Sequence, residues 1–312
     1  MRIRDAVAWH RPLMTVGLAC AVLVPVGAVG MLVDPRTLLG APLWMKPTKF
    51  AVSIAIFCIS WAWLYDQVRA RRGRIRGVYA AGVLAAITLA IEIAVITVQA
   101  GRSTTSHFNL STALDGALWT TMGVSIVAAW LGTLWLSGAL FGVRGLDPAR
   151  ALAIRAGAVL ALVGMALAFL MTTATPAQRA DFQGIAGAHT VGLPDGGPGL
   201  PLVGWSTVAG DLRVPHFIGM HALQLPLLLI GLELAASRLA PLADPRVRRD
   251  LVATAAAGYT GLLALVTWQA LRGQPLFSPD PWTAAATGVL VLGVAGGVVL
   301  SLRRAPALTP GR

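Results

Sequence analysis

Residues 210–224 bring together the side chains best suited to chemistry. Their sequence, GDLRVPHFIGMHALQ, places an acid, a base, two imidazoles and a carboxamide at the start of a long apolar run. Pro215 suits the first turn of a helix, where a missing N–H group costs nothing. In such a helix His221 and Gln224 share a face, whereas His216 and His221 diverge by roughly 140°. Ionisable groups carried into a bilayer are expensive, so we predict a functional site here.

Glu92 is the most isolated carboxylate, because it lies deep inside another apolar run. Placing a charge there costs about 2.5–3.5 kcal/mol on insertion scales. The residue is therefore either a proton-transfer or ligand-binding group, or a protonated acid hydrogen-bonded inside the bundle. Gln99 follows seven residues later on the same face. Asp115 begins the next run, where it can cap the helix or pair with Arg102. Glu92 and Asp115 are the predicted acid–base residues.

The remaining candidates are imidazoles and cations near the ends of apolar runs. Imidazole nitrogens bind haem iron, copper or zinc, so a haem or a transition metal is the first hypothesis for a cofactor. The predicted metal ligands are His107, His216 and His221. Nearby cations would neutralise haem propionates or another anionic group. The full predicted set of cofactor-binding residues is His107, His216, His221, Gln224, Lys49, Arg102 and Arg213. His189, in a glycine-rich loop, is expected to be solvated.

Composition identifies the class of protein that must position these residues. The chain has 312 residues, of which 56% are hydrophobic and 12% charged, whereas about 25% of residues are charged in an average soluble domain. The net charge of +12 comes from arginines clustered between apolar runs, which is typical of cytoplasmic loops and does not indicate a nucleic-acid partner. Cys20 and Cys58 lie inside apolar runs and are expected to be buried, not disulfide-bonded.

Eight apolar runs are long enough to cross a bilayer, which predicts an all-α polytopic membrane helix bundle. They cover approximately residues 14–33, 50–64, 77–100, 111–143, 156–172, 215–234, 252–271 and 282–303. We interpret residues 1–312 as one integral membrane domain whose lipid partner is the bilayer of the cell membrane.

The arginine clusters predict the orientation of this bundle. Both termini should be cytoplasmic, with 305–312 as a cytoplasmic tail and 173–213 as an external loop rich in glycine and proline. Four of the five histidines then fall on the outer side, as do Lys46 and Lys49. We therefore predict that the site lies in the outer half of the bundle.

A weak internal repeat sharpens this picture. TVQAGR (97–102) resembles TWQALR (267–272), and PTKF (47–50) resembles PHF (215–217). Both matches are four spans apart and run in the same direction. A tandem duplication of four helices, with halves 1–148 and 149–304, would explain them. Chance similarity between short apolar segments is the alternative.

The span count, the outer-side histidines that open the fourth and sixth spans, and the two Gln-x-x-Arg segments together loosely resemble the haem A synthase family. Members of that family are duplicated eight-span bundles whose outer-side histidines bind haem. The resemblance therefore implies a haem or metal site. The family has paired histidines in each half and a glutamate near the first. This chain departs from that pattern at two places. Lys49 stands where the second span would offer a histidine, and the eighth span, which opens with Pro281 and Trp282, has no histidine.

Three functions remain open. The first is a haem- or metal-binding redox protein. The second is a transporter or binder of an amphiphilic anion, whose mark is a discontinuous helix; Pro25 and Pro226 are the candidate breakers. The third is a cofactor-free acid–base enzyme acting on a lipid or isoprenoid. In each case the third, fourth and sixth spans should pack together, with a shared cavity lined by Glu92, Gln99, Asp115, His221 and Gln224.

Overall fold

The computed structural model describes residues 6–236 and 238–304, so the predicted tail 305–312 lies outside the described residues. Within this part of the chain, eight helical spans are long and apolar enough to cross a membrane, which confirms the predicted all-α bundle. The spans are α2 (Arg11–Val33), α3 (Met45–Arg72), α4 (Arg76–Gly101), α5 (Ala113–Phe141), α6 (Pro148–Ala166) continued by η1 (Leu167–Met171), a sixth span made of α8 (Arg213–Met220), η2 (His221–Gln224) and α9 (Leu225–Ala235), α10 (Pro245–Leu271) and α11 (Pro281–Arg303).

Several helices extend beyond the predicted apolar runs. α3 continues to Arg72, and α6 and α10 begin seven or eight residues before the expected starts. Both of these starts have an aspartate cap followed by proline: Asp147 accepts hydrogen bonds from two backbone N–H groups, and Asp244 from one. Aspartate caps and a proline in the first turn favour helix initiation, so both helices begin before their apolar runs.

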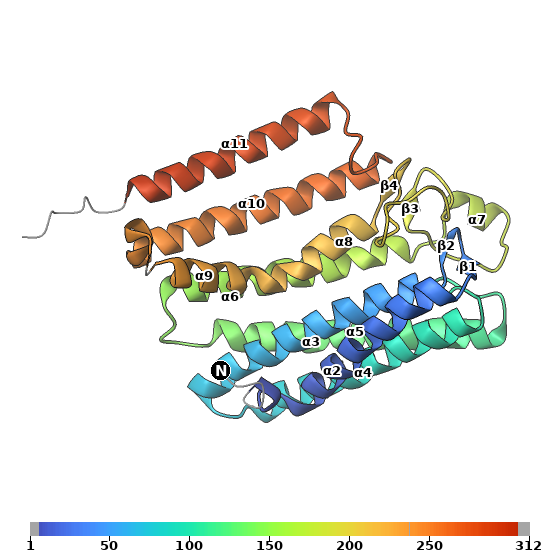
Figure 1. The fold of residues 1–312 in the computed structure, drawn as a ribbon, viewed down its shortest axis with the longest axis horizontal. Helices are drawn as coiled ribbons and strands as arrows, with labels where there is room; N and C mark the ends of the chain where they lie inside the picture. The colour runs from blue at the N-terminus through green and yellow to red at the C-terminus, as the bar shows by residue number, and fades with distance from the viewer. Residues whose placement is uncertain (1–5, 237, 305–312) are drawn as a thin grey trace, which may run out of the picture.

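The helices form two groups of four (Figure 1). In the first group α2 packs on α3 and α4 packs on α5, while in the second α6 packs on the sixth span and α10 packs on α11. Contacts between α5 and α6, and between α3 and η2, join the groups. The division between the groups, at the start of α6, falls close to the boundary of the predicted halves, and both the halves and the duplication stay predictions.

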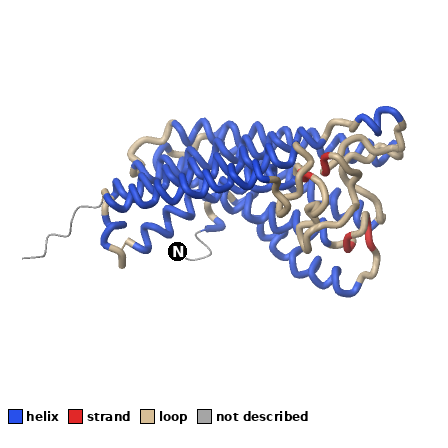
Figure 2. Tube along the Cα trace, turned by 90° about the horizontal axis from the view of Figure 1, so that it is seen from above, coloured by secondary structure: helices blue, strands red, loops and turns tan. Residues whose placement is uncertain are grey.

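Loops and short strands gather at one end of the bundle (Figure 2). This end, called the lid end, carries the hairpin of β1 (Thr37–Leu38) with β2 (Ala41–Pro42), and the pair β3 (Thr190–Val191) with β4 (Gly210–Asp211). It also carries the lid, residues 172–212, which includes the short helix α7 (Pro176–Ala180). The opposite end, the arginine end, contains η3 (Ala240–Ala243) and both described chain ends.

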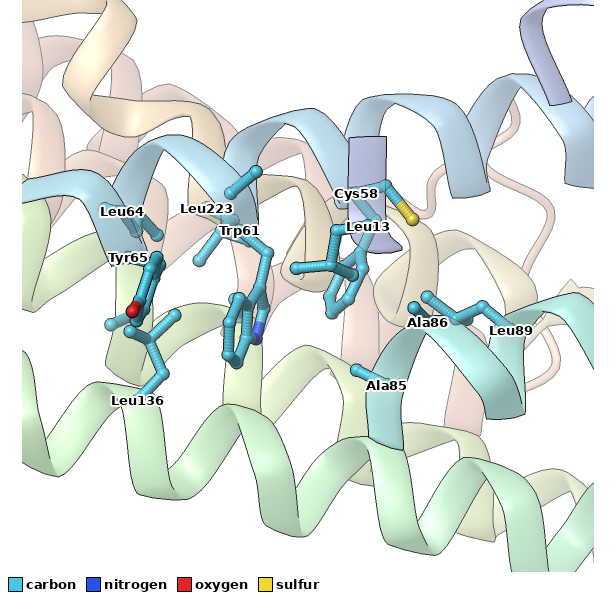
Figure 3. Packing of buried hydrophobic residues seen from close by; sticks show 14 of the residues in the cluster. Leu13, Cys58, Trp61, Leu64, Tyr65, Ala85, Ala86, Leu89, Leu136 and Leu223 are labelled. Atoms are coloured by element: carbon cyan, nitrogen blue, oxygen red, sulfur yellow. The ribbon is translucent and has the colours of Figure 1, made fainter. Parts of the chain in front are cut away.

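The largest apolar core lies mainly in the first group of helices, extends to α6 and η2, and is centred on Trp61 and Tyr65 of α3 (Figure 3). Leu13 of α2, Ala85 of α4 and Leu136 of α5 close around them. By contrast α11 is peripheral, with large apolar side chains that face outward. Such exposed apolar surface is expected where lipid surrounds the helix.

Candidate functional site at the lid end

His107 occupies the loop between α4 and α5 and links polar side chains from three segments. Its Nδ1 lies 3.3 Å from Lys46 Nζ and 3.1 Å from Ser106 Oγ. Because an ammonium group can only donate, Nδ1 accepts and the Nε2–H group points toward Glu92, with 3.6 Å between Nε2 and Oε1. Glu92 Oε2 is buried without a hydrogen-bond partner. The series Lys46, His107, Glu92 therefore leads from the lid end into the bundle.

Aromatic rings enclose His107. The rings of Phe50, Trp119 and Phe108 have their centroids 5.6, 5.5 and 6.0 Å from its imidazole. Burial, followed by the positive charge of Lys46, holds the pKa of His107 well below its usual range. His107 is therefore neutral at physiological pH, which is the form that can accept from Lys46.

His189 is not solvated, so that prediction from the sequence was wrong. Its side chain is 19% exposed and packs on Phe108, with 5.0 Å between ring centroids. Its Nδ1 donates to Asp195 Oδ2 over 2.6 Å, and Asp195 also accepts from two backbone N–H groups and the Thr190 hydroxyl. Burial lowers the pKa of His189, although the hydrogen bond to Asp195 opposes this shift. The Asp195 carboxylate therefore holds residues 189–195 of the lid together and keeps the His189 ring against Phe108.

Lys49 and Arg213 meet the tip hairpin, which we define as lid residues 199–206. Lys49 Nζ donates to the Val203 carbonyl over 3.0 Å, and Arg213 Nη2 donates to the Gly204 carbonyl over 2.6 Å. Arg213 also pairs with Asp211 at 2.5 Å. Two cations, from near the starts of the second and sixth spans, thus each donate to one of two consecutive backbone carbonyls.

His216 is held by close packing between two helices. Its Nδ1 donates to the Gly164 carbonyl over 2.9 Å. A Cβ added at Gly164 would lie 2.1 Å from the backbone of Gly219, so glycine at this crossing lets α6 and α8 approach closely enough for the bond. The Nε2 atom of His216 is left as the acceptor nitrogen of a neutral imidazole.

His221 and Gln224 form a second polar group, further along the sixth span. The helix tightens to a 3₁₀ turn at these residues, which aligns side chains three apart, and His221 Nδ1 lies 3.1 Å from Gln224 Oε1. Gln224 Nε2 donates to Ser60 Oγ of α3 over 2.7 Å, and His221 Nε2 is buried without a partner. Pro226 follows the turn and supplies no N–H group to the preceding helix. Pro25, by contrast, does not interrupt α2.

Asp115 lies apart from both groups and is fully engaged in closing the α4–α5 hairpin. It accepts from Gln99 Nε2, Arg102 Nη1 and Thr112 Oγ1 over 2.8, 2.7 and 2.7 Å. Of the two alternatives predicted for it, pairing with Arg102 is the one observed. Gln99 is used in this network and does not face a site shared with His221.

The predicted common cavity of the third, fourth and sixth spans is not formed. α4 packs mainly on α5, whereas the sixth span packs mainly on α6 and α10 and reaches α3 through η2. Hence Glu92 groups with His107 and Lys46, and His221 groups with Gln224 and Ser60.

The structure also adds site residues that the sequence predictions omitted: Lys46, His189 and Asp195. Lys46 could have been found because Lys46 and Lys49 are the only lysines in the chain. Among residues 6–236 and 238–304, no group of three or more His, Cys, Asp or Glu side chains is arranged to hold a metal ion, so His107, His216 and His221 do not form one. No family model, curated protein or solved structure matched the chain in comparison.

Proposed function

We propose that this membrane protein binds an amphiphilic anion beneath the tip hairpin, with Lys49 and Arg213 as the receptor for the charged group. The observation that carries the proposal is the pairing of these two cations with the carbonyls of Val203 and Gly204. Carboxylate and phosphate oxygens are stronger acceptors for ammonium and guanidinium groups than neutral carbonyls are. An anion is therefore expected to displace the tip hairpin and take over its hydrogen bonds.

The balance of charge around the hairpin supports an anionic ligand. Neither Lys46 nor Lys49 forms an ion pair with any carboxylate in the described part of the chain. Both side chains are half-buried, and a cation removed from water without a counter-ion is costly. A bound carboxylate or phosphate would offset this cost.

Features beside the cations suit the apolar part of such a ligand. Trp205 of the hairpin packs on Phe217 of α8, with 5.5 Å between ring centroids. The sixth span is discontinuous at η2, which is the property expected of a transporter or binder with a site inside the bundle. Leu202, at the exposed tip, has a φ of +64°, a conformation that costs energy for a residue other than glycine. A strained tip is easier to displace.

The test measures palmitate binding to the full chain in nanodiscs of phosphatidylcholine, with hexadecanol as the uncharged ligand of matched chain. The variant Lys49→Gln/Arg213→Gln should weaken palmitate binding by about tenfold or more, since each lost charged hydrogen bond contributes roughly 1.5–3 kcal/mol. Hexadecanol binding should not change. The control is Arg36→Gln, which removes a lid-end cation already paired with Asp34 at 2.7 Å. Equal palmitate affinity in the double variant and the control would overturn the proposal.

Haem binding is a second candidate, favoured by His221. Its Nδ1 faces the Gln224 carbonyl oxygen and its Nε2 is buried without a partner, which is how an iron-binding imidazole is oriented. His221 would hold the haem iron, Lys49 and Arg213 would pair with its propionates, and a bound haem would supply one-electron chemistry. A Soret band after haemin addition that His221→Ala abolishes would support this candidate. The absence of a band in the unaltered protein would eliminate it.

A further inference from the structure

A cavity at the arginine end, far from the lid, is lined by four arginines. Its volume is about 700 Å³, and it lies between the α3–α4 turn and the α5–α6 loop. Its lining consists of Arg71, Arg72, Phe141, Gly142, Val143, Arg144 and Arg155, with no carboxylate among them. None of the four arginines forms an ion pair within the described residues. The cavity therefore concentrates positive charge without a counter-ion.

The guanidinium groups in this cavity retain unused donors. Arg155 donates to the Phe141 and Val143 carbonyls over 3.2 and 3.4 Å, and Arg72 donates to the Ala139 carbonyl over 3.3 Å. Arg155 Nε is buried and has no hydrogen-bond partner. Each guanidinium has five N–H groups in a planar fork suited to phosphate oxygens, so neutral carbonyls leave much of this capacity free.

An apolar groove leads away from the same cavity. It begins at Arg72 and runs between α4 and α5, lined by Ile75, Val78, Leu131, Leu134, Trp135, Gly138 and Ala139. Leu131, Trp135, Gly138 and Gly142 follow one another at steps of four, three and four residues, so they form one stripe of α5 that ends in the arginine cavity. Trp135 is 62% exposed, so the groove is open at the surface of the bundle, where an acyl chain could enter it.

We propose that the cavity and the groove together bind one anionic phospholipid, with its phosphate among the arginines and an acyl chain along the groove. Charge complementarity identifies the occupant, because basic pockets beside membrane helices bind anionic head groups. A zwitterionic lipid would bring its own cation against four arginines, so the site should discriminate against it. This proposal does not depend on the ligand proposed for the lid end.

The experiment follows quenching of Trp135 fluorescence in detergent-solubilised full-length protein. Phosphatidylglycerol with brominated acyl chains is compared with the phosphatidylcholine of the same chains. In the unaltered protein, the concentration of phosphatidylglycerol that gives half-maximal quenching should be at least about fivefold lower than that of phosphatidylcholine. This factor corresponds to roughly one arginine–lipid contact. Trp135→Phe should remove this saturable component. Inorganic phosphate at the same concentration should not relieve the quenching; full relief would mean that the site binds free phosphate.

Two double variants remove the charge separately. Arg72→Gln/Arg155→Gln should reduce the lipid preference to near parity. Arg71→Gln/Arg144→Gln removes exposed side chains that hold no other helix, so a folding defect is not expected, and it should also lower the preference. Arg69→Gln is the control, because Arg69 is paired with Asp66 at 2.6 Å and does not line the cavity. Equal affinity for the two lipids in the unaltered protein, or an unchanged preference in both double variants, would overturn the proposal.

Discussion

Arg102 and Asp115 close the hairpin between α4 and α5, with Nη1 2.7 Å from Oδ1. The second half of the chain contains a parallel arrangement: Arg272 Nη2 lies 2.6 Å from Asp280 Oδ2, across the turn between α10 and α11. The Gln-x-x-Arg segments that suggested an internal repeat thus both end in a clamp between helix ends. In each, the glutamine amide also donates to a carbonyl of the intervening loop, so the repeated residues have a structural role.

Asp115→Asn should destabilise the protein through this clamp. Asp115 is 4% exposed and accepts three side-chain hydrogen bonds, so loss of its charge should cost about 1.5–3 kcal/mol. Thermal unfolding in detergent of Asp115→Asn, Arg102→Gln and the double variant forms a double-mutant cycle. The double variant should be less destabilised than the sum of the two single variants, because both act on one interaction. Strict additivity would contradict the clamp.

Glu92→Gln should leave stability unchanged or raise it by about 1 kcal/mol. One carboxyl oxygen of Glu92 is buried without a partner, and the other lies 3.6 Å from an imidazole that burial keeps neutral. Replacing a poorly compensated buried acid by an amide should therefore not weaken the fold. Thermal unfolding in detergent gives the measurement. A loss of more than about 2 kcal/mol would show that Glu92 is a structural residue, as Asp115 is.

Acidification should open the lid through His189. Its pKa in the folded lid is lowered by burial, whereas an open lid would restore an ordinary value of about 6.5. The open lid then binds the proton more readily, so lid stability is complete above this value and falls as pH decreases below it. Burial raises the pKa of Asp195, but the hydrogen bonds and charge of His189 and the hydrogen bond from Thr190 together outweigh burial, so the pKa is lowered. This lowered pKa acts in the same direction at lower pH.

Hydrogen exchange across residues 188–196, corrected for intrinsic rates, measures this effect. Protection should fall between about pH 7.5 and about pH 5.5 in the unaltered protein. In His189→Gln, which lacks a titrating ring, the fall in this interval should be smaller. Protection that follows the same pH profile in both proteins would contradict the role of His189.

Gly204→Ala should uncover Lys49. Gly204 has a φ of +66°, and a Cβ there would lie 3.1 Å from Met45 Cε, so alanine should loosen the tip hairpin. Because the chain has two lysines, reductive methylation followed by mass spectrometry reads Lys49 directly. Its rate should rise by about fivefold, which corresponds to roughly 1 kcal/mol of strain. Gly192→Ala is the control: its φ is +94° but the surrounding space is open. A similar increase in the methylation rate of Lys49 in both variants would show that strain anywhere in the lid has this effect, and would contradict a specific role of the tip hairpin.

Gly164→Ala should destabilise the crossing of α6 and α8. The added Cβ would meet the backbone of Gly219, which cannot move aside as a flexible side chain can, and overpacking costs about 1–3 kcal/mol or more. Gly231→Ala, in α9 with nothing within 4 Å of its Cβ, should instead stabilise by up to about 1 kcal/mol. Thermal unfolding of the two variants should therefore move in opposite directions, and a matched change in both would contradict close packing at Gly164.

Local properties of the sequence were enough to predict the eight spans and their all-α class. Whether a segment can cross a bilayer depends on the summed hydrophobicity of about twenty consecutive residues, and a bilayer permits few backbone structures other than helices. The aspartate and proline signals that begin α6 and α10 are also local, and the earlier helix starts could have been predicted from them. Lys49, Arg213 and the histidines were likewise recognisable as candidates from their types and positions.

Tertiary structure alone decided how those candidates are grouped. Glu92 and Asp115 were both predicted as acid–base residues, but Asp115 is neutralised by Arg102 whereas Glu92 faces His107. His189 was expected in water, yet Asp195 turns the lid inward and buries the imidazole. The lid has no hydrophobic period to predict its path, and its contacts join residues up to about 150 positions apart, such as Lys49 and Val203. The energy of such contacts depends on which helices are neighbours, and the sequence of a single apolar run does not determine its neighbours.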